Sequence, residues 1–180
     1  MVLTNDKKLA ERIKSLRVHG ADPKYYHKEV GYNSRLDAIQ AAILRVKLKY
    51  LNEWNEGRQK VAAIYERLFK KYGLEDTIII PHKKIENSTH VYHQYVVRVS
   101  NRDELQRKLK EKGISTAVYY PVPLHLQECY KEFGYKEGDL VISEQACKEV
   151  LALPIDPEIS AEQVEYVIGI IKKYMKKYDK

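Results

Sequence analysis

Residues 34–73, SRLDAIQAAILRVKLKYLNEWNEGRQKVAAIYERLFKKYG, carry the longest helical pattern in the chain. Ser34, followed by Asp37 three positions later, is typical of a helix start. A helix over 35–72 would be about 57 Å long at 1.5 Å per residue, which exceeds the width of a compact domain of this size. It must join two bodies, pack against another chain, or bend near Gly57. Its apolar stripe consists of Leu36, Ile39, Ile43, Val46, Tyr50, Trp54, Val61, Ile64, Leu68 and Tyr72.

Further elements are expected on both sides of this helix. Residues 1–4 have the pattern of a strand end, Asn5 to Gly20 that of a capped amphipathic helix, and residues 22–31 that of a structured loop. After the long helix, strands alternate with helices, which predicts a small α/β sandwich with helices on a face of one sheet. The expected strands are 77–81, 90–99, 114–119 and 151–153, and the expected helices are 101–113, 139–150 and a last one opened by Ser160 and Gln163.

The composition describes one ordinary globular domain or slightly more, with 180 residues, 44% hydrophobic and 32% charged. A chain of this length buries enough surface to fold without disulfides, so Cys129 and Cys147 are interpreted as reduced. The N-terminus lacks the apolar stretch of a signal peptide, and no segment approaches the roughly 20 apolar residues of a membrane span. We therefore expect a cytoplasmic protein with no membrane partner.

The formal net charge of +7 raises the possibility of a nucleic-acid ligand. Lys108, Lys110 and Lys112, however, alternate with Glu104 and Glu111, which is typical of a solvated helix face. The sequence also contains no recognisable nucleic-acid-binding motif. No nucleic-acid partner is expected.

Residues 19–35, HGADPKYYHKEVGYNSR, form the first of two polar patches rich in aromatic residues. The patch leads into the first turn of the long helix, where free N–H groups and the positive end of the helix dipole favour an anion. Asn33 and Arg35 are placed to contact a phosphate there. An equally weighted alternative is that Asn33 or Ser34 only caps the helix.

Residues 119–127, YYPVPLHLQ, form the second patch, in which Tyr119, Tyr120 and His125 gather around a stiff proline turn. The alternative is that the tyrosines pack and that His125 is a histidine at the rim. No metal site is expected, because the strand spacing of His90 and His93 puts them on opposite faces. The chain also lacks a phosphate-binding glycine loop and the G-x-S-x-G and C-x-x-C motifs.

Several stretches spread over the whole chain resemble one family. The sequence is similar to the C-terminal part of the DegT/DnrJ/EryC1/StrS family of pyridoxal-phosphate (PLP) sugar aminotransferases. The matching stretches are MVLTND at 1–6, RVHG at 17–20, GYNSRLDAIQAAIL at 31–44, KLKYLNEWNEGR at 47–58, HVYHQYVVR at 90–98, GISTAVYYPVPLHLQECY at 113–130 and ALPIDPEIS at 152–160.

The resemblance implies an α/β (α+β) fold, the C-terminal small domain of the aspartate-aminotransferase-like fold, fold type I of the PLP enzymes. Residues 1–34 would then be a remnant of the large cofactor domain with an active-site loop. Residues 35–72 would be a long connecting helix, and residues 73–180 the small domain. In the family, two subunits form a dimer with active sites at the interface.

The resemblance also implies which residues belong to the site. Asn33 resembles the residue that reaches across the dimer to the phosphate of the partner's PLP, and Arg35 lies beside that site. Residues expected at the substrate are found in two loops: Tyr26 and His27 would approach the partner's cavity, and Tyr120 and His125 would line the entrance for a nucleotide-linked keto sugar. No catalytic residue is assigned, because the family's Schiff-base lysine would precede Met1 and transamination needs that amine.

The function implied by the resemblance is amino transfer from glutamate or glutamine to a keto sugar nucleotide, in surface-polysaccharide or antibiotic-sugar biosynthesis. Without the lysine, the chain alone is not expected to be active. It would act as a homodimer or with the missing N-terminal half. The alternative is a non-catalytic interaction domain that dimerises through its long helix.

Overall fold

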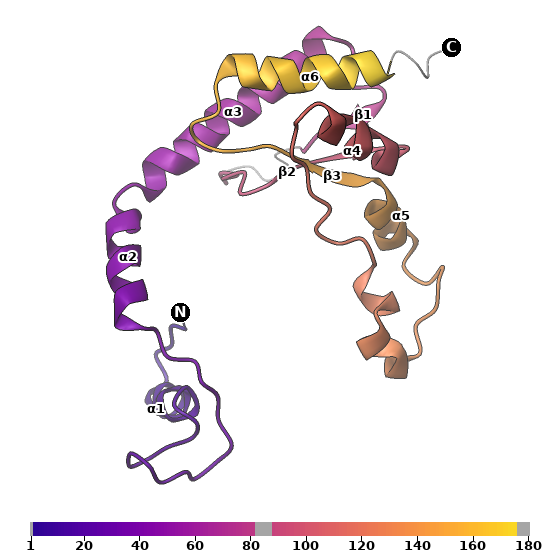
Figure 1. Ribbon diagram of the computed structural model, residues 1–180. Coiled ribbons are helices and arrows are strands. Elements are labelled where there is room, and N and C mark those ends of the chain that lie inside the picture. The colour runs from indigo at the N-terminus through magenta and orange to yellow at the C-terminus, as the bar shows by residue number, and fades with distance from the viewer. Residues whose placement is uncertain (1, 82–87, 176–180) are drawn as a thin grey trace. The chain divides into compact units, whose positions relative to one another are not determined.

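The computed structural model describes residues 2–81 and 88–175. The chain divides into two compact units, Met1–Tyr50 and Leu51–Lys180 (Figure 1). The boundary falls within the segment that the sequence predicts as one helix over 35–72.

That segment contains two helices, α2 (Ala38–Leu48) and α3 (Leu51–Lys71). Between them, the Lys49 and Tyr50 amides donate to carbonyls three residues back, at 3.2 and 3.1 Å, so the four-residue bonding pattern of an α-helix is interrupted. The prediction of a continuous helix is therefore corrected, and the interruption lies before Gly57. Neither Lys49 nor Tyr50 is a helix breaker, and nothing in the local sequence signals the turn.

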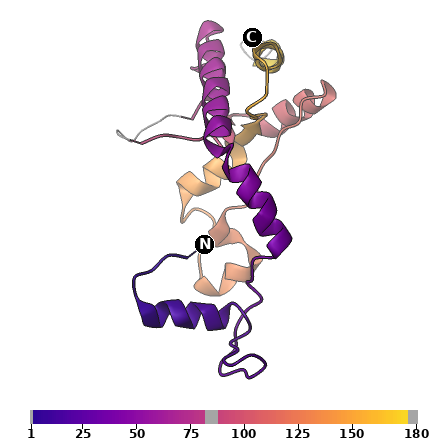
Figure 2. The same cartoon turned by 90° about the vertical axis from the view of Figure 1, so that its left-hand side faces the viewer.

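The first unit consists of α1 (Lys7–Leu16), a long loop, and α2 (Figure 2). Asp6 rather than Asn5 caps α1, and its carboxylate accepts the amides of Lys8 at 2.8 Å and Leu9 at 3.2 Å. No strand is found over the described residues 2–4, and Met1 lies outside them. No residue of α1 or α2 is buried, so within the described chain this unit has no hydrophobic core of its own.

The second unit is built on a three-stranded antiparallel sheet in the order β1-β2-β3. Its strands are β1 (Ile78–Ile79), β2 (Tyr95–Val99) and β3 (Val150–Leu153). In the register, Ile78 lies opposite Val99, and Tyr95 lies opposite Leu153. Alternate residues of β2 are fully buried, as a strand with one face on the core requires.

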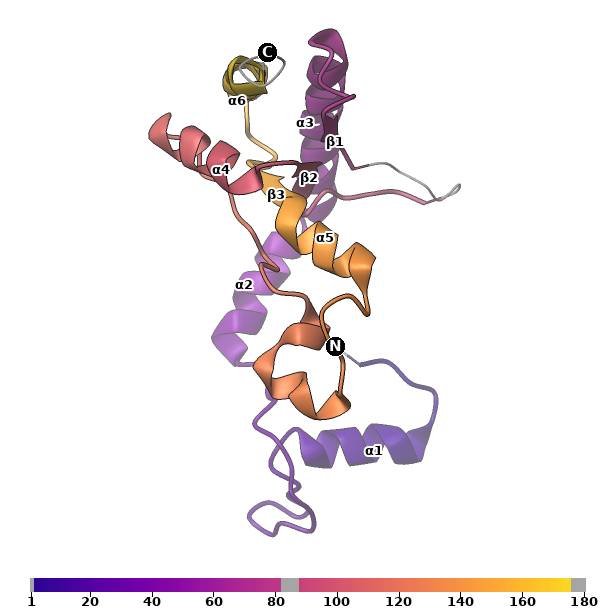
Figure 3. The same ribbon diagram turned by 90° about the vertical axis from the view of Figure 1, so that its right-hand side faces the viewer.

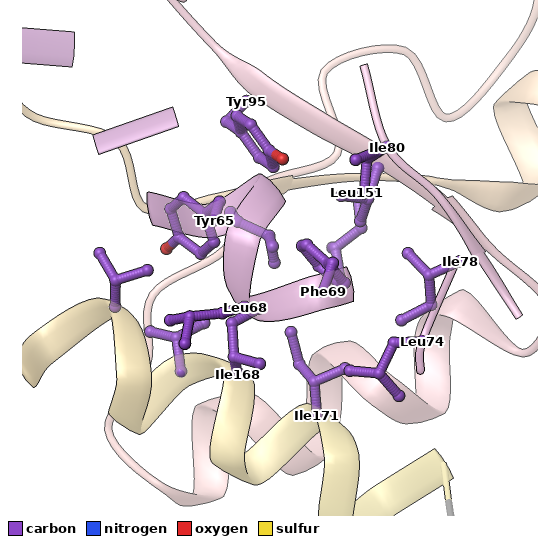
Figure 4. Packing of buried hydrophobic residues seen from close by; sticks show 14 of the residues in the cluster. Tyr65, Leu68, Phe69, Leu74, Ile78, Ile80, Tyr95, Leu151, Ile168 and Ile171 are labelled. Carbon is purple, nitrogen blue, oxygen red and sulfur yellow. The ribbon is translucent and has the colours of Figure 1, made fainter. Parts of the chain in front are cut away.

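Two helices, α3 and α6 (Ala161–Met175), lie side by side and pack on the buried face of the sheet (Figures 1 and 3). Tyr65 and Phe69 from α3 point towards the sheet, and Ile168 and Ile171 from α6 pack against α3 (Figure 4). All of these side chains are essentially inaccessible to solvent. The remaining helices of the unit are α4 (Arg102–Glu111), α5 (Val141–Glu149), and the 3-10 helices η1 (Leu124–Leu126) and η2 (Glu128–Phe133).

The predicted start of the last helix is confirmed in detail. The Gln163 side chain accepts the Ser160 amide at 2.9 Å, and the Ser160 hydroxyl accepts the Gln163 amide at 3.3 Å. These reciprocal bonds form a capping box, which satisfies amides that the first turn of a helix leaves unpaired. The helix itself runs from Ala161.

Three predicted strands are shorter than the sequence suggests. The strand expected over 77–81 is confined to Ile78–Ile79. The strand expected over 90–99 begins only at Tyr95, because Tyr92 has a left-handed backbone (φ 47°) and its amide donates to the His90 ring at 2.9 Å. The strand expected over 114–119 is reduced to one bridge between Ala117 and Ala152, with N–O distances of 3.2 and 2.8 Å. Two prolines follow at 121 and 123, and their missing N–H groups prevent the ladder from extending.

Gly57 has a packing role rather than a hinge role. It lies within α3, and a Cβ there would stand 2.7 Å from the Pro157 Cβ and 3.0 Å from the Pro157 carbonyl oxygen. The helix therefore approaches the segment before α6 more closely than any larger residue allows. This contact explains why the apolar stripe is interrupted at this position.

Candidate functional site

The first candidate patch, residues 19–35, contains a loop whose two ends are joined by backbone hydrogen bonds. The Tyr32 amide donates to the Leu16 carbonyl at 2.7 Å, and the His19 amide donates to the Tyr32 carbonyl at 3.0 Å. Gly31 lies so close to Gly20 that a Cβ on it would stand 2.3 Å from the Gly20 nitrogen. The RVHG and GYN stretches therefore depend on each other, since only glycine permits this approach.

Tyr26 and His27 lie within this loop, where His27 pairs with Ala21 in an antiparallel bridge. Tyr26 is 70% exposed, whereas one side of the His27 ring faces the loop, with Nδ1 2.9 Å from the His19 carbonyl oxygen. A carbonyl can only accept a hydrogen bond, so Nδ1 carries the proton in this contact. Nε2 is then the acceptor nitrogen of a neutral His27.

Asn33 and Arg35 are exposed and precede α2. The residue that caps α2 is Asp37, whose carboxylate accepts the amides of Ile39 at 2.8 Å and Gln40 at 3.4 Å. The expectation that Ser34 or Asn33 caps the helix is therefore wrong. The helix-dipole argument for an anion site fails as well, because a carboxylate already satisfies the first free amides. A role for Asn33 and Arg35 at a phosphate thus depends on the family resemblance.

In the second patch, residues 119–127, the tyrosines and the histidine differ in their exposure to solvent. Tyr119 and Tyr120 are 52% and 62% exposed, so the alternative in which they pack is wrong. His125 is only 8% exposed, and it is not a rim residue. Its Nε2 lies 3.0 Å from the Glu144 Oε1.

Glu144 is the functional candidate that the sequence analysis missed. It is 7% exposed and lies on α5, and its carboxylate also accepts the amides of Gly138 and Leu140. These bonds, first that from Gly138 and then that from His125, hold the pKa of Glu144 below its ordinary value of 4.5. No local signal could have revealed it, because His125 and Glu144 are 19 positions apart.

The structure places the candidate residues in different units. Tyr26, His27, Asn33 and Arg35 belong to the first unit, and Tyr120 and His125 belong to the second. Within residues 2–81 and 88–175, no group of three or more His, Cys, Asp or Glu side chains could hold a metal ion. In the same residues, no helix is long and apolar enough to cross a bilayer.

The lysine side chains of the described residues are all at least partly exposed to solvent. A Schiff-base lysine needs an enclosed pocket that lowers its pKa. Throughout the described parts of the chain, every lysine is exposed or half-buried, and none is enclosed.

Comparison with known proteins settles the relationship. The model of the DegT/DnrJ/EryC1/StrS aminotransferase family matches residues 1–172. The chain belongs to this family. The resemblance inferred from the sequence motifs is thereby confirmed.

Individual relatives in this aminotransferase family extend the comparison. The chain is 50% identical to the "pleiotropic regulatory protein" of Geobacillus stearothermophilus over 99% of its own length and 47% of that protein. It is 40% identical to the dTDP-3-amino-3,6-dideoxy-alpha-D-galactopyranose transaminase of Aneurinibacillus thermoaerophilus, over 96% of this chain and 46% of that one. The chain thus spans just under half the length of these relatives.

A solved structure shows the same fold. The structure of DesV from S. venezuelae, in complex with a ketimine intermediate, matches with a TM-score of 0.85 and 38% identity. The match covers 96% of this chain and 45% of DesV. The predicted fold, the C-terminal part of a fold type I aminotransferase, is confirmed.

Proposed function

We propose that this chain is the C-terminal portion of a PLP-dependent nucleotide-sugar aminotransferase that transfers an amino group from glutamate or glutamine to a keto sugar nucleotide. The observation that carries the proposal is the extent of the match: 96% of this chain aligns with 46% of a dTDP-amino-sugar transaminase. By itself the chain does not catalyse transamination, because none of its described lysines is enclosed.

The proposed roles divide the site between this chain and a partner, either a second copy or an N-terminal half of the enzyme. Asn33 and Arg35 contact the phosphate of PLP held by the partner. Tyr26 and His27, within an exposed loop, reach the partner's cavity, and the exposed Tyr120 lines the substrate entrance with His125 behind it. PLP, when bound, supplies the electron sink for the reaction, and these residues bind and orient.

Reductive labelling tests the proposal. The purified chain is incubated with PLP, reduced with borohydride, and analysed by intact mass and peptide mapping. We expect scattered or absent labelling, because exposed amines react without selection.

The urea-unfolded chain, labelled in the same way, is the control for unselective reaction. The folded chain should show no lysine labelled more strongly than in that control. A single stoichiometric adduct at one lysine would mean that the chain has a complete cofactor site, and the proposal would be wrong.

A second candidate function is a non-catalytic dimerising domain derived from the same family. Two observations favour it: a relative 50% identical to the chain is named a pleiotropic regulatory protein, and α2 exposes an apolar face. Ile39 is 71% exposed, Ile43 47% and Val46 58%. An exposed apolar face of this kind is typical of a surface that binds another protein chain.

Sedimentation equilibrium tests this candidate. We expect a concentration-dependent dimer, and the double variant Ile39→Glu, Ile43→Glu should shift the population to monomer. Gln40→Glu also adds negative charge at an exposed position of the same helix, without removing an apolar side chain, and should leave the dimer unchanged. A wild-type chain that remains monomeric would count against this function.

A further inference from the structure

The segment 128–143 leads into the first turn of α5 (Figure 3) and has no buried side chain. Every residue from 128 to 143 is exposed, including Phe133 at 64% and Ile142 at 81%. Its 3-10 turns are stabilised by local backbone bonds, such as that from the Tyr130 amide to the Gln127 carbonyl at 3.0 Å. Local bonds do not fix where such a segment lies relative to the rest of the fold.

Glu144 connects the two ends of this segment. Its Oε1 accepts from His125 Nε2 at 3.0 Å on the near side, and from the Gly138 and Leu140 amides at 2.9 and 3.2 Å on the far side. Its Oε2 is 3.0 Å from the same Gly138 amide. A buried carboxylate with this many donors forms stronger hydrogen bonds than a neutral acceptor would.

The carboxylate also determines the state of the His125 ring. An ionised carboxylate can only accept, so Nε2 of His125 carries the hydrogen of this bond. The side chain is 5% exposed, and the edge of Tyr135 contacts its ring at a centroid distance of 6.0 Å. The orientation of the ring is therefore fixed, and a neutral ring carries its hydrogen on Nε2.

We propose that Glu144 is a positioning residue, which fixes His125 in the Nε2–H tautomer and thereby sets the position of Tyr120. His125 transmits this constraint through Pro121 and Pro123, whose rings restrict the backbone between it and Tyr120. His125 thus supports the loop from within and does not itself contact the substrate. The inference rests on the proposed function only in placing Tyr120 at the substrate entrance.

The test uses NMR on the chain as it is, without PLP or substrate. In the ¹⁵N-labelled wild type, long-range proton–nitrogen spectra at neutral pH should show His125 with its hydrogen on Nε2. In Glu144→Leu, which removes every acceptor at this position, this single tautomer should be lost, the Tyr120 amide resonance should shift, and the Gly138 and Leu140 amides should exchange with solvent about tenfold faster or more, as the loss of a charge-assisted bond predicts.

Glu132→Leu is the matched control. It removes an exposed carboxylate of the same segment that is not adjacent to Gly138 or Leu140, and it should change none of these signals. A wild-type His125 with its hydrogen on Nδ1 would overturn the proposal whether or not the variant folds. Unchanged Tyr120 and Gly138 signals in a folded Glu144→Leu would overturn it as well. Because no cofactor is added, failure here is distinct from failure of the proposed function.

Discussion

Two buried tyrosines of the second unit have different hydrogen bonding in the same surroundings. The rings of Tyr65 and Tyr95 stack with centroids 4.7 Å apart, and burial raises the pKa of both hydroxyls. The Tyr65 hydroxyl donates to the Pro154 carbonyl at 2.9 Å, whereas the Tyr95 hydroxyl has no hydrogen-bond partner among the described residues. A buried hydroxyl without a partner costs free energy, and a bonded one does not.

Removing each hydroxyl in turn should therefore have opposite effects. Tyr65→Phe should lower the free energy of unfolding by about 1 kcal/mol, because the Pro154 carbonyl loses its donor. Tyr95→Phe should raise it by about 1 kcal/mol, because it removes an unpaired polar group. Urea denaturation followed by circular dichroism measures both. Equal losses in the two variants would contradict the assigned hydrogen bonding.

Glu149 makes stability depend on pH. The Gln145 amide donates to its Oε1 at 2.7 Å, and Arg98 donates to its Oε2 at 2.7 and 3.0 Å. The Gln145 bond first, and then Arg98, hold the pKa of Glu149 below its ordinary value of 4.5. Since the folded-state pKa is the lower one, the stabilisation is complete above 4.5 and is lost as the pH falls through the folded-state value.

Glu149→Gln should reveal this dependence. At pH 7 it should lower the free energy of unfolding by about 1–2 kcal/mol, as expected for hydrogen bonds to a charged group. Below pH 4, the free energies of unfolding of this variant and of the wild type, measured by urea titration, should lie closer together. Glu128→Gln, which removes an exposed ion pair with Lys131, should cost less than about 0.5 kcal/mol at either pH. A difference that does not change with pH would argue against an ionised Glu149.

At the scale of the element, two helical glycines in the second unit differ in what surrounds them. Gly57 in α3 faces Pro157, with no room for a Cβ. At Gly169 in α6, no heavy atom beyond its chain neighbours and its own helix backbone lies within 4 Å of the place a Cβ would take. Alanine favours a helix over glycine by about 1 kcal/mol at either position. Only at Gly57 does packing oppose that preference.

The two alanine substitutions should therefore differ in sign. Gly169→Ala should raise the free energy of unfolding by about 1 kcal/mol through helix propensity alone. Gly57→Ala should lower it by about 1–2 kcal/mol, because overpacking against a proline and its carbonyl outweighs the propensity gain. Urea midpoints of the two variants provide the comparison. If the Gly57→Ala variant were more stable than the wild type, the segment around Pro157 would have to move aside without a loss of stability.

At the scale of the whole molecule, the hydrophobic core lies entirely in one unit. Its buried residues run from Val61 to Tyr174, and no residue of the first unit belongs to it. The described first unit instead contains two helices with no buried side chain. Burial of apolar surface is the main stabilising contribution in folding, so the second unit carries nearly all of the stability.

Deleting residues 1–50 should therefore leave the second unit folded. The chain of residues 51–180 should unfold with a free energy within about 0.5 kcal/mol of the full chain, as expected for independent parts. Thermal and urea unfolding by circular dichroism measure this quantity. A loss of more than about 2 kcal/mol would mean that the first unit contributes to the core.

Much of this fold was predictable because its causes are local. The capping box of Ser160 and Gln163, the alternation of apolar residues in β2 and the helix of α4 all depend on residues within a few positions of one another. Motifs such as GYN and YYPVPLHLQ identified the family from the sequence alone, and the family model confirms it. The assignments of Asn33, Arg35 and Tyr26 to the site stay predictions.

The sequence by itself thus determined the family, the fold class and most helices and strands, because these follow from local patterns. Only the tertiary structure showed that the long helix is interrupted at Lys49 and Tyr50, that Gly57 meets Pro157, and that His125 is buried against Glu144. The two contacts join residues that are distant along the chain, and such pairings depend on how the elements pack, which no local pattern encodes.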